Sequence, residues 1–331
     1  MKQTLKTVLG AGLGILLVGC GSPSFLAPNS TISNSEAHLY WILIYLSIAV
    51  FLLVEIWLAI NIIRWRRRPG DDTPPEQIHG NNRLEIIWTV LPILLVTVIF
   101  ILTVRTVQAV APPSPQASDL NVHVIGHRWW WEFDYPDQGV ITANELHIPV
   151  GTTVQLTLDS ADVIHSFWVP QLSGKTDVIP GQTNHMWMKA DTIGEFHGQC
   201  AEFCGQNHAN MRIKVVVQSQ ADFDAWLQNQ EQDPPQPQTA DQQAGYKLIT
   251  TGICSNCHAL GTVSGPDNPV GPNLSHLFSR SVFAGATYDL TEDNIRRWLT
   301  QNQQMKPGND MNVTLTSDQV NQLMAYLTTL K

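Results

Sequence analysis

The sequence predicts a multidomain chain in which a two-helix transmembrane hairpin precedes an all-β sandwich and then an all-α domain. Three observations lead to this fold class: two apolar runs of membrane-spanning length before residue 110, alternating β-branched residues from about 120 to 218, and helically spaced apolar residues near the C-terminus. A chain of 331 residues has room for two soluble domains and membrane anchors, because a typical domain takes about 100–200 residues.

The N-terminus has the pattern of a secretory signal. Two lysines precede an apolar run from Val8 to Val18, and a small residue follows it. We therefore expect residues 1–19 to be a cleaved signal peptide. The run Leu17–Cys20 also resembles the lipobox of bacterial lipoproteins, in which Cys20 becomes the lipidated first residue. An ordinary signal peptide or an uncleaved anchor is the alternative.

Two segments are long and apolar enough to cross a membrane, residues 38–63 and 84–107. The intervening loop, 64–83, contains five arginines, whereas residues 20–37 contain no Lys or Arg. Because positively charged loops stay in the cytoplasm, the N-terminal segment 20–37 and everything after residue 107 should lie outside the cytoplasmic membrane of a bacterium. The prediction is a multi-pass membrane protein with both soluble domains on the extracytoplasmic side.

The soluble part is acidic. From residue 121 to the end there are 21 Asp or Glu against 11 Lys or Arg, and the whole chain has a formal charge of -9. Nucleic acid is excluded as a partner, because phosphate binding needs basic surface. An acidic surface steers basic partners toward it, although it also serves solubility alone.

Each of the five cysteines belongs to a short motif, and none is left over for a structural disulfide. This usage favours ligands and attachment points over a disulfide framework. The cysteines are Cys20, Cys200, Cys204, Cys254 and Cys257.

The β-rich domain, expected at residues 118–220, contains a dense set of metal-ligand side chains. The run from Cys200 to Met211 combines two thiols, an imidazole and a thioether, and His165 is available from an earlier loop. Thiolate, imidazole and a weak thioether on a β-sandwich are typical of electron-transfer copper. Two cysteines four residues apart allow both sulfurs to bridge a pair of coppers.

Two other interpretations of the segment from Cys200 to Met211 remain open. Cys200, Cys204, His208 and His165 could form a tetrahedral zinc site, in which Met211 has no role. The two cysteines could also form a disulfide in an oxidising compartment.

A Gln-, Asp- and Pro-rich stretch at residues 228–240 predicts an extended linker to the last domain. Beyond it, Cys254, Cys257 and His258 form the C-x-x-C-H motif of covalent haem attachment. A thioredoxin-like C-x-x-C is the alternative, but it needs no histidine and normally lies in a βαβ unit. The flanks are helical here: a capping box at 316–319 precedes apolar residues at helical spacing, Val320, Leu323, Met324 and Leu327.

Residues from about 36 to 218 resemble subunit II of haem-copper cytochrome c oxidases. The matching segments are Leu84–Pro92, Gly126–Trp131, Asp162–Phe167, Lys175–Gly181 and Cys200–Met211. The resemblance implies a cupredoxin-like sandwich with a dinuclear copper A centre. It implies that Cys200 and Cys204 bridge both coppers, that His165 and Met211 complete one, and that His208 and the Glu202 carbonyl complete the other. It further implies that Glu202 reaches a magnesium ion shared with the catalytic subunit and that Trp129 is the electron-entry residue.

Residues 241–331 resemble a class I cytochrome c, through the haem motif and Gly271–Leu274. Besides His258, a methionine is expected as the second axial ligand of the iron. The loop Lys306–Met311 matches the family's ligand loop, which favours Met311; Met305 is the alternative, whereas Met324 fits the buried face of the last helix.

The covalent fusion of both modules resembles the caa-type oxidases. This implies a subunit that passes electrons from its own haem c to copper A and on to subunit I, which reduces dioxygen to water and pumps protons. Subunit III and membrane lipid are further expected partners, and the upstream donor is a quinol–cytochrome c reductase or a soluble cytochrome c. The alternative is an electron-donating subunit of another haem-copper reductase, such as a nitric oxide reductase.

Overall fold

The computed structural model describes residues 24–66, 70, 77, 79–114, 116, 119–261 and 270–331. The expected signal peptide at 1–19 and the lipidation candidate Cys20 lie outside these residues. The chain divides into two compact units, one of Asn34–Pro113 and one that combines the residues up to Ser33 with Ser114–Lys331. Each unit is described by itself.

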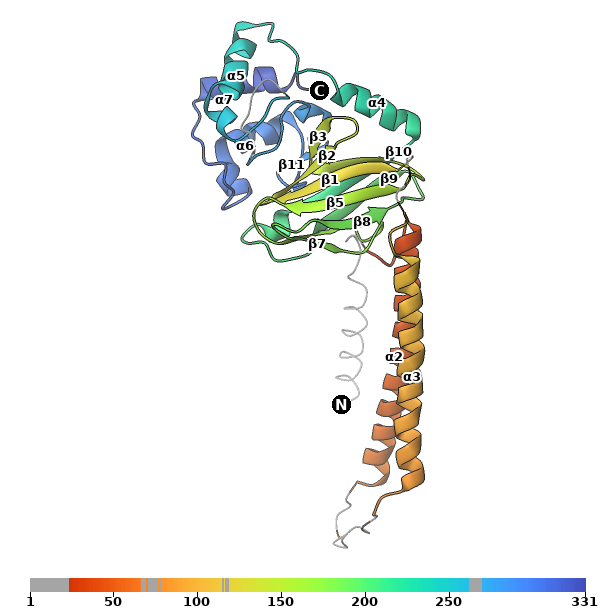
Figure 1. Cartoon of the computed structure of the whole chain (residues 1–331). Coiled ribbons are helices and arrows are strands. Elements are labelled where there is room, and N and C mark those ends of the chain that lie inside the picture. The colour runs from red at the N-terminus through yellow and green to blue at the C-terminus, as the bar shows by residue number, and fades with distance from the viewer. Residues whose placement is uncertain are drawn as a thin grey trace. The chain divides into compact units, whose positions relative to one another are not determined.

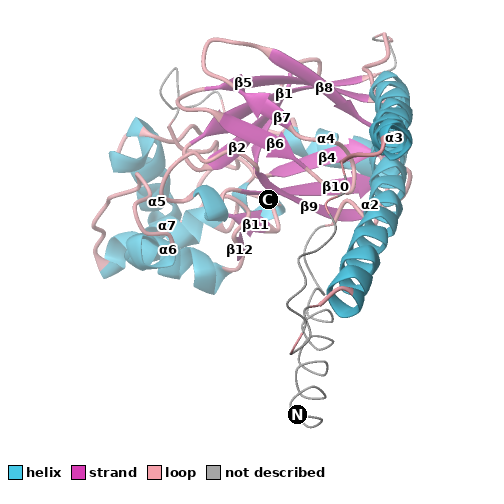
Figure 2. Cartoon of the chain, turned by 90° about the horizontal axis from the view of Figure 1, so that it is seen from below, coloured by secondary structure: helices cyan, strands magenta, loops and turns pink. Residues whose placement is uncertain are grey.

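The first unit is a pair of long helices that lie side by side, α2 (Thr31–Arg64) and α3 (Asn82–Ala109) (Figures 1 and 2). Each contains an 18-residue stretch of high mean hydropathy, 2.5 in α2 and 2.7 in the second helix. Both are long and apolar enough to cross a membrane. The expected two-helix hairpin is therefore present.

Both helices begin before the apolar spans do. The helix α2 begins seven residues earlier than the span expected at 38–63, because Ser30 accepts a hydrogen bond from the Ser33 amide (3.0 Å) and caps its first turn. In the same way, the Asn81 side chain accepts from the Arg83 and Leu84 amides at the start of α3. Caps set where a helix begins, whereas hydropathy marks only its membrane-embedded part.

In the second unit, ten strands form two packed sheets, which confirms the expected β-sandwich (Figure 2). The sheet orders are β3-β2-β1-β5-β8 and β4-β10-β9-β6-β7, and all neighbours are antiparallel except β1 with β5 and β4 with β10. The strands are β1 (Leu120–His127), β2 (Trp130–Tyr135), β3 (Val140–Ala143), β4 (Glu145–Pro149), β5 (Val154–Ser160), β6 (His165–Trp168), β7 (Thr176–Val178), β8 (Asn184–Met188), β9 (Gly194–Cys200) and β10 (Arg212–Gln218).

The alternation read in the sequence places the core between these sheets. Along β5, Val154, Leu156 and Leu158 are all buried while the residues between them are not. Two large aromatic side chains, Trp131 and Phe167, meet edge to face with ring centroids 5.3 Å apart and are fully buried. This rigid core supports the loops at one end of the sandwich, where the metal-ligand residues lie.

A short helix that the sequence did not predict, α4 (Gln220–Gln230), follows the sandwich. Ser219 caps it, and Phe223 and Trp226 pack against the sandwich core; the indole of Trp226 stacks on His147 at 4.3 Å. The expected linker at 228–240 thus begins inside this helix. Polar residues predominate in the helix, so its apolar face is hard to recognise.

The last domain consists mainly of three helices, α5 (Ala240–Thr250), α6 (Glu292–Met305) and α7 (Ser317–Leu327). Between them lie the 3-10 turns η2 (Ile253–Asn256) and η3 (Leu277–Ser279) and a two-residue hairpin, β11 (Val282–Phe283) with β12 (Tyr288–Asp289). The predicted capping box is present: Thr316 accepts from the Gln319 amide, and the Gln319 side chain accepts from Thr316. The all-α prediction is confirmed, apart from this small hairpin.

The crossing of α5 and α7 depends on one glycine. A Cβ added at Gly245 would lie 2.1 Å from the Gln322 carbonyl oxygen, so only glycine allows the two helix backbones to approach this closely. The segment after α4 also packs on this domain, because the Tyr326 hydroxyl donates to the Pro235 carbonyl (3.0 Å). The connection is therefore held against the helical domain along part of its length.

Candidate metal and cofactor sites

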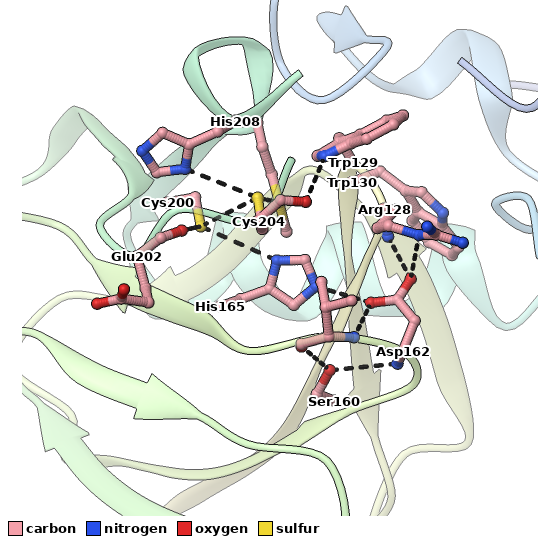
Figure 3. A network of polar contacts seen from close by, with 12 residues as sticks. Arg128, Trp129, Trp130, Ser160, Asp162, His165, Cys200, Glu202, Cys204 and His208 are labelled. Atoms are coloured by element: carbon pink, nitrogen blue, oxygen red, sulfur yellow. Dashed lines mark hydrogen bonds and ion pairs between the residues drawn. The ribbon is translucent and has the colours of Figure 1, made fainter. Parts of the chain in front are cut away.

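Two thiols and an imidazole converge at one end of the sandwich. Cys200 is the last residue of β9 and His165 the first residue of β6, so the two neighbouring strands bring them together (Figure 3). The Cys200 Sγ atom lies 3.9 Å from His165 Nδ1 and 3.8 Å from the Sγ atom of Cys204. The three side chains are buried and their ligand atoms lie within 4.8 Å of one another.

The other expected copper ligands join the same cluster. The Cys204 Sγ atom lies 3.6 Å from His208 Nδ1 and 3.8 Å from Met211 Sδ. The backbone carbonyl of Glu202 lies 3.2 Å from the Cys200 sulfur. All six residues predicted from the sequence are thus brought together, four of them from the single segment between β9 and β10.

The hydrogen bond between the two sulfurs separates their acidities. This contact with Cys204 lowers the pKa of Cys200 to about 3, even though burial opposes a thiolate. The same contact raises the pKa of Cys204. The contact therefore favours the thiolate form of Cys200, which is the form that binds a metal.

His165 is oriented by a carboxylate outside the cluster. Asp162 Oδ1 accepts from His165 Nε2 (2.9 Å), and Asp162 Oδ2 accepts from the Arg128 amide (2.7 Å) (Figure 3). Burial opposes the imidazolium, but the hydrogen bonds to Asp162 and Cys200 raise the pKa of His165. With Nε2 donating to the carboxylate, Nδ1 is left facing the thiols as a ligand atom. The sequence marked Asp162 only as part of a motif, not as this orienting group.

The residues present fit a soft metal pair. The sulfur atoms of Cys200 and Cys204 lie 3.8 Å apart and both cysteines are free, so the disulfide considered above is absent from the structure. Met211 is completely buried with its sulfur inside the cluster, a position that a tetrahedral zinc site of two cysteines and two histidines leaves without a purpose. Two thiolates, an imidazole beside each sulfur and a thioether match copper chemistry.

Trp129 lies between this cluster and a second site. Its indole Nε1 donates to the Cys204 carbonyl (2.9 Å), and its side chain is only 8% exposed. Trp129 also lines a mainly apolar cavity of about 350 Å³, most of whose wall is formed by the helical domain. The residue is therefore in contact with the thiol cluster on one side and with the cavity on the other.

The predicted haem-attachment residues, Cys254, Cys257 and His258, line this cavity. His258 Nδ1 lies 2.8 Å from the Pro272 carbonyl, which requires the imidazole to donate from Nδ1. Burial lowers the pKa of His258, so the ring is neutral and its Nε2 lone pair is free to bind a metal. A Cβ at Gly271 would lie 2.6 Å from this imidazole, so the glycine found here lets the backbone pass the ring.

Of the two candidate methionines, Met305 and Met311, it is Met311 that lines the cavity. Its sulfur accepts a hydrogen bond from Trp298 Nε1 at 3.1 Å. Met305 and Met324 are instead buried in the apolar core of the helical domain, 5% and 2% exposed. The geometry therefore favours Met311 as the sulfur that faces a cofactor.

A buried arginine in the cavity wall was not identified from the sequence. Arg280 Nη2 donates to the Asn273 carbonyl (2.7 Å), but its Nε has no hydrogen-bond partner among the described residues. Burial lowers the pKa of Arg280 to about 10, so it remains charged at neutral pH. A buried cation beside the cavity, whose Nε lacks a hydrogen-bond acceptor among the described residues, fits a cofactor that carries carboxylates, as haem does. A single arginine in a loop gives no sequence signal for this role.

Sequence comparison with protein families finds three matches that together cover most of the chain. The transmembrane domain of cytochrome c oxidase subunit II matches residues 24–105, and the periplasmic domain of the same subunit matches residues 139–219. The cytochrome c family matches residues 242–331.

Individual relatives match over nearly the whole length. A cytochrome c oxidase subunit 2 from Alkalihalophilus pseudofirmus is 38% identical over 330 residues, which cover 96% of this chain and 95% of that relative. The protein of the same name from Bacillus subtilis is 34% identical over 352 residues, covering 100% and 99%. Among solved structures, the periplasmic domain of subunit II of cytochrome oxidase from Bradyrhizobium japonicum is 33% identical, covering 35% of this chain and 96% of that one with a TM-score of 0.34.

Proposed function

The chain belongs to the cytochrome c oxidase subunit II family, and on that premise we propose a role for each residue of its two cofactor sites. As a subunit of a haem-copper terminal oxidase it carries a dinuclear copper A centre in the cupredoxin-like sandwich and one haem c in the C-terminal domain. It passes electrons from the haem to the copper and on to the catalytic subunit, which reduces dioxygen to water with proton pumping. When bound, the copper pair and the haem each supply reversible one-electron transfer.

We propose that Cys200 and Cys204 bridge the two coppers. His165 and Met211 would complete one metal, and His208 with the Glu202 carbonyl the other. The observation that supports this set is the burial of both sulfurs within 4 Å of each other and of an imidazole each. A buried site with fixed ligands suits electron transfer, because little has to move when the charge changes.

In the helical domain, Cys254 and Cys257 would form the thioethers to the haem, with His258 and Met311 as axial ligands. Three observations support this assignment. His258 is hydrogen-bonded to the Pro272 carbonyl, Met311 accepts from Trp298, and both residues line one cavity. A histidine and methionine pair gives a high potential, which is appropriate for an electron carrier. Arg280 would neutralise a carboxylate of the bound group.

Trp129 would be the contact between the two sites. Its position against both the Cys204 carbonyl and the cavity supports electron entry to the copper at this residue. In this chain the donor that reaches Trp129 would be the chain's own haem domain, because Trp129 is buried and lines the cavity that this domain forms. An external cytochrome c or a quinol–cytochrome c reductase would then deliver its electron to the haem.

As a component of a haem-copper oxidase complex, the chain works with other subunits. We propose that the direct acceptor is subunit I, with subunit III as a further neighbour, and that the Glu202 carboxylate takes part in a magnesium site shared with subunit I. The copper domain matches a periplasmic family and follows two membrane-type helices, which makes this a membrane protein with an extracytoplasmic soluble domain. We propose that it is multi-pass in the bacterial cytoplasmic membrane and that the haem domain lies on the same outer side.

Anchoring of the mature N-terminus by a lipid on Cys20 belongs to the same proposal. It rests on the Leu17–Cys20 pattern at the end of the signal sequence. Mass spectrometry of the mature N-terminus decides it: a diacylglyceryl-modified Cys20 is expected, and an unmodified Cys20 or a chain that still begins with Met1 would contradict it.

The function is tested by cofactor content. We expect the purified chain within its oxidase to contain two copper ions and one covalent haem, measured by elemental analysis and by the haem absorption that remains after acid–acetone extraction. Stoichiometric zinc without copper would overturn the copper assignment, and extractable haem would overturn the covalent one.

A further inference from the structure

A buried lysine lies where the sandwich meets the helical domain. Lys306, the C-cap residue of α6, is 4% exposed. Its ammonium donates to three backbone carbonyls, those of Trp129 (2.7 Å), Asn210 (3.0 Å) and Ala284 (3.0 Å). The first two acceptors belong to the sandwich and the third to the helical domain, so this one side chain joins both domains.

The surroundings of the Lys306 ammonium satisfy its hydrogen-bond donors. Burial lowers the pKa of Lys306 to about 7, whereas three carbonyl acceptors match the three donors that the protonated group offers and so favour the charged form. A buried amine is stable only when its donors are satisfied. Removing the ammonium would take a donor away from three carbonyl oxygens in a buried interface, and of these the Asn210 carbonyl would keep its hydrogen bond from the Thr287 hydroxyl (2.9 Å).

On the helical side, the lysine is the first residue of the loop that carries the proposed haem ligand. The Asn309 side chain donates to the Lys306 carbonyl (2.7 Å), and its Oδ1 accepts from the Met311 amide (2.9 Å). The position of Met311 is therefore tied through one asparagine to the residue that contacts the sandwich.

On the sandwich side, the acceptors belong to the proposed copper site. Asn210 directly precedes Met211, and Trp129 donates its indole N–H to the Cys204 carbonyl. Asn207, in the same loop, donates to the carbonyl of Pro307, the neighbour of the lysine (2.7 Å). The loop that carries one cofactor's ligands is thus hydrogen-bonded to the loop that carries the other's.

Further contacts between the two domains are also specific. The Arg212 amide donates to the Gly285 carbonyl (2.8 Å), and the buried carboxylate of Glu145 accepts from the Ser281 amide (2.8 Å). Lys214 donates to the Ser281 hydroxyl (2.7 Å). Two domains that were joined by the linker alone would not need to bury paired polar groups between them. These contacts therefore indicate a specific interface.

We propose that Lys306 is a positioning residue that locks the haem domain onto the copper domain, so that electrons pass between the two cofactors in one fixed arrangement. This inference rests on the proposed function and adds to it. A linker raises the local concentration of a partner but leaves its orientation free. The lysine and its three acceptors fix the orientation, with Trp129 held between the two sites.

The test compares Lys306→Met with Lys247→Met in the complete oxidase. Methionine keeps much of the length of the lysine side chain and removes the ammonium, and Lys247 is an exposed lysine on α5 of the same domain. The first measurement is the rate at which photoreduced haem c passes its electron to the copper. The second is hydrogen exchange at the Arg212 amide, which reports opening of the interface at a hydrogen bond that the mutation does not itself remove.

We expect Lys306→Met to slow the transfer by at least about tenfold, because a small displacement of reacting groups has a large effect on rate. The rate should become sensitive to solvent viscosity, and exchange at Arg212 should accelerate, with haem and copper spectra unchanged. Lys247→Met should behave like the parent.

A parental transfer rate and parental exchange in Lys306→Met would overturn the proposal. If that variant fails to assemble, Lys306→Gln is judged by the same two measurements. A parent without a copper signal would instead contradict the proposed function.

Discussion

Asp162 is the side chain that decides which nitrogen of His165 faces the thiols. It lies in the loop between β5 and β6, with a quarter of its side chain exposed, and its two oxygens bind the imidazole and the Arg128 amide. The partly exposed position means that its removal should leave the sandwich folded. Its loss would instead free the imidazole to rotate or to change tautomer.

We therefore predict that Asp162→Ala lowers copper affinity by roughly 10–100-fold, the usual effect of removing a carboxylate that orients a ligand histidine. Competition with a copper chelator measures this. Asp191→Ala is the matched control, because Asp191 is an exposed aspartate of the same domain. Parental affinity in Asp162→Ala would mean that packing alone orients His165.

The two methionine ligands should be separable by substitution. Met211→Leu and Met311→Leu keep nearly the same volume, so each should cost less than about 1.5 kcal/mol of stability. At copper, loss of a weak thioether should shift the potential and spectrum while both thiolates remain. At haem, loss of one axial ligand should make the iron high-spin or let it capture another ligand, and lower its potential.

Optical and electron paramagnetic resonance spectra of both variants check this prediction. Each variant is the control for the other, since the change should stay at its own centre. A Met311→Leu haem that remains low-spin with an unchanged potential would move the assignment to Met305.

At the residue scale, what the sequence could predict depended on spacing. The copper ligands could be predicted to lie together, because five of the six proposed ligands are found within the twelve residues from Cys200 to Met211. The roles of Arg280 and Lys306 could not be predicted. Each acts through backbone carbonyls or a cavity wall that distant segments of the chain form. In the sequence, an isolated basic residue in a polar loop cannot be distinguished from an ordinary solvated charge.

At the element scale, the α5–α7 crossing should be sensitive to a single methyl group. Gly245→Ala places a Cβ where the backbone of the other helix already lies, 2.1 Å from the Gln322 oxygen. The helices must move apart, and such overpacking typically costs about 1–3 kcal/mol. This exceeds the gain of up to about 1 kcal/mol that alanine brings over glycine in a helix.

Chemical unfolding of the haem domain, followed by haem absorption, measures the effect of Gly245→Ala. Gln243→Ala is the control, because Gln243 is exposed on the same helix. A Gly245→Ala variant as stable as the control would show that the two helices can separate without loss.

Elements with strong local signals were predicted and the others were not. The capping box and helical spacing at 316–327 predicted α7, and alternation predicted the sandwich. The helix α4 was missed, because its few apolar residues matter only once they meet Tyr135 and His147 on the sandwich. The early start of α2 was missed because Ser30 caps it outside the apolar run.

At the scale of the whole molecule, the composition of residues 228–240 predicted an extended linker to the last domain, and in the structure the two domains are also joined directly by paired buried groups. Their apolar cores nevertheless remain separate. One cluster fills the sandwich and includes Cys200 and Met211, and the other fills the helical domain. Separate cores joined through a polar interface should be able to fold one without the other, because most of the stability comes from each core.

The double variant Cys254→Ser, Cys257→Ser tests this independence. Without thiols no thioether can form, so covalent haem should be lost and the helical domain, deprived of the group that fills its cavity, should become much less stable. The sandwich should keep its fold and its copper spectrum, because the residues of the attachment motif are not part of its apolar cluster. Elemental analysis and electron paramagnetic resonance measure the copper, and acid–acetone extraction measures the haem.

Lys247→Met again serves as the control, because it is a neutral change in the haem domain. Loss of copper together with haem would mean that the polar interface around Lys306 makes the two domains a single cooperative unit. Retention of copper would mean that the interface fixes their orientation but leaves each core to fold by itself.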